Sequence, residues 1–207
     1  MNRILLLAAL AFGCGSSSKP TTPPPPTPGA AQGLDYQDPA GSGWRLVRHS
    51  SSTVDRLVLE LHGPAGERTR GVGFNLQGPA GVRFGTFASG LPVENGETYT
   101  LGSVDSLDPS EPVALAGGVL PDNVLSVGVY QKDRGWPARD SGAALLRIVV
   151  QLDPSANLAS GASVALSVLK AKAIPEDIGG VNDDPYVLQN KLRMKDVPIA
   201  VGKVVAL

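Results

Sequence analysis

Arg70–Gln77 reads RGVGFNLQ, and this stretch decides the fold because large apolar residues occupy every second position along it. In an extended chain Val72, Phe74 and Leu76 share one face, and the glycine and amide side chains between them share the other. This period of two indicates a strand buried on one face only, as in antiparallel sheets. The turn residues Gly78–Gly81 (GPAG) then end the strand.

The same alternation recurs on both sides of this segment, and glycine, proline and Asn-Gly or Asp-Pro pairs separate the repeats. Strands are predicted at Val54–His62, Val82–Phe87, Leu125–Tyr130, Leu146–Leu152, Val164–Val168 and Val197–Leu207. Weaker strand candidates are Trp44–Val47, Thr98–Leu101 and Val113–Leu120. No stretch has a sustained helical period, although Tyr186–Met194 could form a short helix after Pro185.

Eight to ten short strands without helices predict an all-β chain with a single antiparallel β-sandwich over residues 34–207. The composition agrees, because 25 glycines and 18 prolines in 207 residues supply many turns. A formal net charge of −1 argues against a nucleic-acid-binding protein, which usually presents a basic face. One cysteine and two histidines exclude a disulfide framework and a His/Cys zinc cluster.

The first fourteen residues, MNRILLLAALAFGC, have the features of an export signal. The apolar run Ile4–Phe12 would span about 14 Å as a helix, less than half of a bilayer core of roughly 30 Å. Residues 1–13 are therefore predicted to be a signal peptide. The end of the run resembles a bacterial lipobox, which implies that Cys14, the only cysteine, is lipidated. An ordinary signal peptide with Cys14 as a bystander is the alternative.

Residues 14–33 are predicted to be a lipidated cysteine followed by a disordered tether. The segment is rich in Pro, Ser and Thr and lacks large hydrophobic side chains, so it cannot offset the entropy of ordering. A tether of this kind would hold the domain away from a membrane. Gly15 after the cysteine resembles the outer-membrane sorting pattern, so we expect a lipid-anchored cell-envelope protein, more at the outer than the inner membrane.

Four stretches of the domain resemble a cohesin-like module: Gly71–Leu76 with the following Gly78–Phe84, then Val124–Gln131, Ser141–Leu152 and Gly161–Lys170. The resemblance covers residues 44–207 and implies a nine-stranded jelly-roll sandwich, related in fold to carbohydrate-binding modules. Cohesins are binding modules that take a dockerin, so the resemblance also implies a binding role.

The two histidines are the residues to weigh as catalytic bases. His49 precedes Ser50–Ser52, but a nucleophile, a base and an orienting group need a defined geometry that adjacent loop residues do not ensure. We interpret this segment as a polar turn. His62 is expected on a solvent-facing side beside Glu60.

Acidic residues gather between Pro175 and Pro185: Glu176, Asp177, Asp183 and Asp184. Calcium takes six to eight oxygen ligands, so Asp183 and Asp184 are candidate calcium ligands, although the regular Asp-x-Asp-x-Asp-Gly loop is missing. No other cofactor is expected. A carboxylate pair for glycoside hydrolysis is the enzymatic alternative for these residues.

Exposed aromatic rings bind the apolar faces of sugars. Trp136 lies in a polar loop flanked by charges, and Tyr130 faces outward by strand alternation, so both are candidate ligand-binding residues. Trp44 is expected in the core. The sequence thus predicts a membrane-anchored, non-enzymatic binding or scaffold module with a protein or polysaccharide partner. A carbohydrate-active envelope enzyme and a purely structural envelope lipoprotein are the alternatives.

Overall fold

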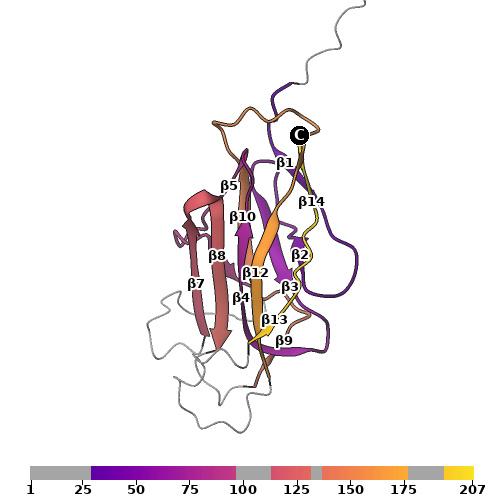
Figure 1. The fold of residues 1–207 in the computed structure, drawn as a ribbon, viewed down its shortest axis with the longest axis vertical. Helices are drawn as coiled ribbons and strands as arrows, with labels where there is room; N and C mark the ends of the chain where they lie inside the picture. The colour runs from indigo at the N-terminus through magenta and orange to yellow at the C-terminus, as the bar shows by residue number, and fades with distance from the viewer. Residues whose placement is uncertain (1–28, 97–112, 132–136, 177–193) are drawn as a thin grey trace, which may run out of the picture.

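The computed structural model describes residues 29–96, 113–131, 137–176 and 194–207, and these form a β-sandwich whose strands run along its long axis (Figure 1). All strand-to-strand pairings are antiparallel. The predicted all-β antiparallel sandwich is therefore confirmed.

The larger layer is a six-stranded sheet. Its spatial order is β13 (Lys195–Asp196), β12 (Ser167–Pro175), β4 (Arg68–Gln77), β8 (Val124–Gln131) and β7 (Val113–Leu120), and β9 (Arg139–Asp140) also pairs with β4. The short 3₁₀ turn η1 (Pro121–Asn123) connects β7 to β8. β4 lies near the centre of this sheet, so the segment that decides the fold pairs on both sides.

The second layer is a five-stranded sheet in the order β2 (Arg45–Arg48), β3 (Leu57–His62), β10 (Leu146–Leu152) and β5 (Val82–Phe84), with β6 (Val93–Asn95) also pairing with β10. A three-stranded sheet of β1 (Leu34–Gln37), β14 (Lys203–Ala206) and β11 (Ser163–Val164) closes one end. Residues near both ends of the described chain meet there, because the Gln32 amide donates to the Leu207 carbonyl at 2.6 Å.

The core lies between the two larger sheets and follows the alternation of the sequence. Leu57, Leu59 and Leu61 of β3 are fully buried, and Phe74 and Leu76 of β4 face them from the other layer. Burying an apolar side chain of this size contributes roughly 1.5–3 kcal/mol, so this cluster is the main source of stability. Trp44 is buried at 7% exposure, as expected.

Four predicted strands are wrong in extent. Val54–His62 begins only at Leu57, and Val82–Phe87 ends at Phe84. Val164–Val168 is not one strand, because the chain leaves the three-stranded sheet after Val164 and joins β4 from Ser167 onward. Val197–Leu207 contributes only β14, since Pro198 has no N–H to donate and Ala200 forms a single parallel bridge with Arg45. Val54 lies in a turn before β3 and is 49% exposed.

The expected disordered tether is wrong for its last residues. Ala30 bridges Ala159, and the amide of Ala31 donates to Leu158 at 2.8 Å. Gly33 fits closely against Val54, where a side chain would collide. These residues thus join the sandwich through backbone hydrogen bonds, and the Ala31 side chain is buried. The ordered domain thus begins before Leu34.

Candidate functional site

On the outward face of the six-stranded sheet, glycines and short polar residues lie side by side on β4 and β8. Gly73 of β4 is directly opposite Gly128 of β8, and Asn75 is opposite Ser126 in the same register. Their neighbours in sequence point into the core, so these four residues face away from it. A glycine pair in mid-sheet leaves the backbone uncovered, which lowers the surface at this point.

The lowered surface forms an open trough of about 340 Å³ over β4, β8 and β12. Lys170, Lys172 and Ile174 of β12 line one side, and Tyr130 of β8 and Met194 line the rest. Tyr130 is 44% exposed and Met194 is 41% exposed. Large apolar side chains that remain this exposed beside a hollow are typical of surfaces that contact another molecule.

The trough also carries positive charge from β12. The Lys172 ammonium pairs with Asp196 at 2.8 Å, and Asp196 itself is 82% exposed. Lys170 is exposed and has no ion pair among the described residues. The trough therefore combines an apolar end, hydrogen-bonding side chains from Asn75 and Ser126, and a cationic rim.

Of the residues singled out from the sequence, the structure brings only Tyr130 to this trough. Trp136, the candidate calcium ligands Asp183 and Asp184, and Cys14 lie outside the described residues. The ligand-binding role of Trp136 and the calcium-binding role of Asp183 and Asp184 therefore stay predictions.

Glu176 is described, and its carboxylate pairs with the Arg68 guanidinium at 3.0 Å. No group of three or more potential metal-binding side chains occurs within the part of the chain that the structure describes. Among the same residues, no helix is long and apolar enough to cross a membrane. The calcium site remains a prediction.

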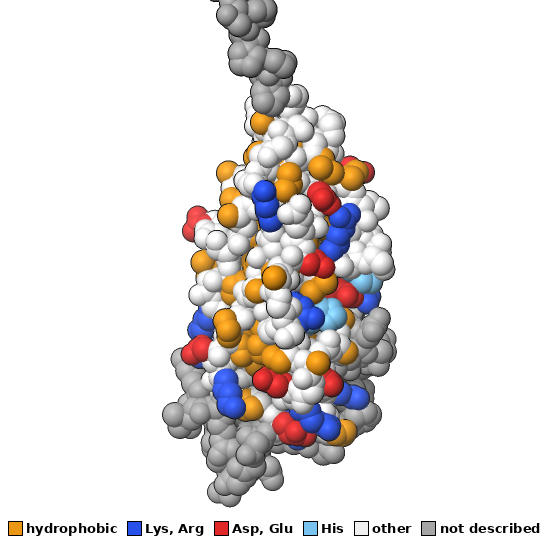
Figure 2. All heavy atoms as spheres, turned by 90° about the vertical axis from the view of Figure 1, so that its right-hand side faces the viewer, with side chains coloured by type: hydrophobic (Ala, Val, Ile, Leu, Met, Phe, Trp, Pro, Cys, Tyr) orange, Lys and Arg blue, Asp and Glu red, His pale blue; other side chains and the backbone are white. Residues whose placement is uncertain are grey.

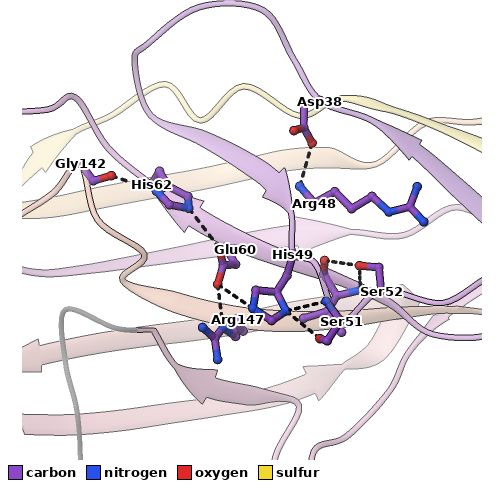
Figure 3. A network of polar contacts seen from close by, with 10 residues as sticks. Asp38, Arg48, His49, Ser51, Ser52, Glu60, His62, Gly142 and Arg147 are labelled. Carbon is purple, nitrogen blue, oxygen red and sulfur yellow. Dashed lines mark hydrogen bonds and ion pairs between the residues drawn. The ribbon is translucent and has the colours of Figure 1, made fainter.

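A second polar cluster lies on the outer face of the five-stranded sheet, centred on Glu60 of β3 (Figure 3). The Glu60 carboxylate accepts a hydrogen bond from Arg147 Nε at 2.7 Å, and it lies 3.3 Å from His62 Nε2 and 3.5 Å from His49 Nε2. The Glu60 side chain is only 12% exposed. The pale-blue histidine side chains lie among acidic and basic side chains on the side of the molecule shown in Figure 2.

This cluster contains the serine–histidine contact that the sequence led us to interpret as a polar turn. His49 Nδ1 is 2.6 Å from Ser51 Oγ, so a nucleophile, a base and a carboxylate do lie in series. However, the backbone N–H of Ser51 donates to His49 Nδ1 at 3.2 Å, and that of Ser52 donates to the His49 carbonyl at 3.0 Å. Both amides nearest to the hydroxyl are thus committed within the turn, and neither can stabilise an oxyanion.

The cluster is better explained as a structural clamp, by which we mean that its ion pairs and hydrogen bonds hold β3 to β10 and to the segments beside them. Arg147 lies directly opposite Glu60 in the pairing of β10 with β3, so their ion pair crosses two strands. His62 Nδ1 lies 3.0 Å from the Gly142 carbonyl and ties β3 to the segment before β10. His49 ties the turn after β2 to the same carboxylate. His62 thus lies beside Glu60 on the polar side of β3, as expected.

The sequence contains one signal for the trough. Gly73 and Gly128 both fall at outward positions of strands with clear alternation, beside Asn75 and Ser126. Alternation shows that these residues face outward. It does not show that the two strands are neighbours or that the two glycines are paired, so the trough appears only in three dimensions.

Comparisons with known proteins give matches only to solved structures. No family model and no curated protein matches the chain. A type II cohesin domain from the Acetivibrio cellulolyticus cellulosome has a TM-score of 0.49 and 9% identity over 81% of this chain and 96% of that one. A non-cellulosomal cohesin from Archaeoglobus fulgidus has a TM-score of 0.45 and 10% identity over 78% and 87%.

A third match is a chain of a type I cohesin–dockerin complex from Clostridium thermocellum, with a TM-score of 0.45 and 9% identity over 86% of this chain and 96% of that one. The solved structures to which the chain is similar are thus cohesin modules, each with a TM-score below 0.5. At these identities the likeness concerns the fold alone, and the function must be argued from the chain's own residues.

Proposed function

We propose that this chain is a lipid-anchored, non-enzymatic binding module of the cell envelope, and that its trough takes a protein partner. The observation that supports this most is the trough itself, where exposed Tyr130 and Met194 border a floor of paired glycines. Exposed aromatic and methionine side chains around a hollow are enriched at protein interfaces. Lys170 at the rim would select a partner segment with a carboxylate at the matching position.

A protein partner suits the trough better than a polysaccharide does. Sugar-binding sites use aromatic rings as stacking platforms, and Tyr130 is the only aromatic side chain with an exposed ring among the described residues that line the trough. The open glycine floor instead permits close approach of a peptide backbone or a helix.

A non-enzymatic role is supported by the way in which the polar groups are paired. The Ser51–His49–Glu60 series has its nearest amides committed within the turn, and the Glu60 carboxylate is shared with Arg147. Glu176, one of the four candidate hydrolytic carboxylates, is paired with Arg68. Among the described residues, these carboxylates are thus engaged in ion pairs that join strands, and this supports a structural role for them rather than a catalytic one.

Anchoring is supported by the signal-like N-terminus and by Cys14 as the only cysteine. We expect cells grown with an alkyne-bearing palmitate to label the wild-type chain, and Cys14→Ser to abolish the label. The Cys14→Ser chain should also leave the membrane fraction. Equal labelling of the two chains would show that Cys14 is not the lipid-anchored residue. It would not contradict the proposed binding role of the domain.

Binding is tested by capturing partners from an envelope extract with the full-length chain and two variants. Tyr130→Ala removes an exposed side chain from the trough, and Val54→Ala removes one of similar exposure, 49% against 44%, outside it. We expect wild type and Val54→Ala to retain the same protein saturably, and Tyr130→Ala to retain at least about tenfold less. Equal capture by all three chains would show that the trough is not the binding site.

A further inference from the structure

The edge strand β7 offers a row of backbone groups to another strand. All eight residues of β7, VALAGGVL, pair with β8 on one side. Within the described ranges, no backbone hydrogen bond joins the other side of β7 to any segment. Such a row of N–H and C=O groups is a template for a further strand.

Two other sheet edges, β13 and β2, are protected in ways that β7 is not. β13, the opposite edge of the same sheet, has only two residues, Lys195 and Asp196, and both are charged. β2 contains Arg45 and Arg48, and the amide of its Leu46 already donates to Ala200 at 2.9 Å. β7 has neither a charged side chain nor a proline, and its pairing with β8 is continuous. Natural edges usually use charge, proline, shortness or bulges to prevent pairing.

Val119 of β7 is an apolar residue that would become less exposed if another strand paired with this edge. Val119 lies opposite the fully buried Leu125 of β8, yet it is itself 50% exposed. Residues directly opposite one another in an antiparallel pair share a face, so Val119 belongs to the core side of the sheet. Its exposure is therefore what an incomplete sheet leaves at its edge.

We propose that β7 pairs antiparallel with β7 of a second copy of this chain, which joins two six-stranded sheets into one. A two-fold axis at Gly117 would place Leu115 of one copy opposite Val119 of the other, and Ala116 opposite Gly118. Each pair then lies on one face, and Val119 gains an apolar neighbour. A second copy suits this edge because the uncharged sequence meets no like charge when it is paired with itself. This inference is independent of the proposed function.

The test is light scattering of the full-length chain in detergent over a range of protein concentrations, with two matched variants. Val119→Lys puts an ammonium where the partner's Leu115 would lie, whereas in the single copy it can extend into solvent. Val54→Lys makes the same change away from the edge, at a site of similar exposure, 49% against 50%. We expect dimers for wild type and Val54→Lys, and a dimer dissociation constant at least about tenfold higher for Val119→Lys.

Hydrogen exchange of the β7 amides keeps the test informative if Val119→Lys is poorly folded. Pairing predicts that protection of these wild-type amides rises with protein concentration and parallels the dimer fraction. A wild-type chain that stays monomeric throughout would overturn the proposal. So would a dimer that Val119→Lys leaves unchanged, or β7 protection that is independent of concentration, which would mean that another part of the same chain covers the edge.

Discussion

At the scale of single residues, the Glu60 carboxylate is shared by three basic side chains. Arg147, His62 and His49 all converge on it, although its side chain is only 12% exposed (Figure 3). Removing one member of a largely buried ion pair leaves the other charge without compensation, and that cost exceeds the net contribution of the pair itself.

We therefore expect Glu60→Gln to lower the free energy of unfolding by about 2 kcal/mol, measured by urea denaturation at pH 7. Glu67→Gln is the matched control, because Glu67 is an exposed residue outside this cluster and should change stability by less than about 0.5 kcal/mol. If the two variants lose the same amount, the clamp is not a stabilising feature.

Tyr36 gives the molecule a dependence on alkaline pH. Its hydroxyl donates to the Leu46 carbonyl at 3.0 Å and accepts from the Gly202 amide at 2.6 Å. Burial raises the pKa of Tyr36 to about 12, and the Gly202 hydrogen bond lowers the pKa by less than burial raises it. Below about pH 10 the tyrosine is neutral in both the folded and the unfolded chain, so its contribution there is constant.

Between about pH 10 and pH 12 the unfolded chain releases this proton and the folded chain keeps it, so the free energy of unfolding should fall, by about 3 kcal/mol in all. Tyr36→Phe should start less stable, because the Gly202 amide and the Leu46 carbonyl lose their partner, but it should lose less as the pH rises. Urea denaturation at about pH 9 and about pH 11.5 measures both slopes. Parallel slopes for the two chains would contradict this account of Tyr36.

At the scale of elements, the turn between β7 and β8 is bonded to the connection from β4 to β5, which passes from one sheet to the other. Asn123 Nδ2 donates to the Gly78 carbonyl at 3.1 Å and to the Val82 carbonyl at 2.8 Å. The residue also has a φ of 53°, in the left-handed region that asparagine tolerates better than most residues. A single side chain thus links the turn after β4 to the turn before β8.

Asn123→Ala should cost about 2 kcal/mol of unfolding free energy, from two lost hydrogen bonds and an unfavourable φ. Asn123→Gly keeps the backbone relaxed and should recover part of that loss, which separates the two causes. Thermal or urea unfolding of both variants is the measurement. No difference from wild type in either variant would show that the turn does not depend on this amide.

The elements also show what the sequence could predict. β4, β8 and β10 follow strict alternation over most of their length, and their buried faces are the predicted ones. β1 and β6 were missed, because strands of three or four residues give too few repeats to establish a period. The change of sheet between β11 and β12 was missed because alternation continues through it: Val164 and Leu166 are both buried.

At the scale of the whole molecule, the sandwich class was predictable from local patterns and the candidate site was not. The outward direction of Tyr130 follows from alternation, and its 44% exposure agrees. The trough requires Gly73 to face Gly128 across two strands that lie far apart in sequence, with β12 on the other side. Pairing of distant strands is a property of the assembled sheet, which a single sequence does not reveal.

The central claim is that the trough binds a protein, and one substitution tests it most directly. A Cβ at Gly128 would lie 3.4 Å from the nearest atom, so a side chain fits there and must extend into the trough. Gly43 has no atom within 4 Å of the position that a Cβ would take, and it does not line the trough, so Gly43→Gln is the matched control.

The measurement is the dissociation constant of the captured partner for wild type, Gly128→Gln and Gly43→Gln, by calorimetric titration. We predict that Gly128→Gln raises the dissociation constant by about a hundredfold, while Gly43→Gln leaves it within about twofold of wild type. An unchanged dissociation constant for a folded Gly128→Gln chain would contradict the account and move the binding surface away from this sheet.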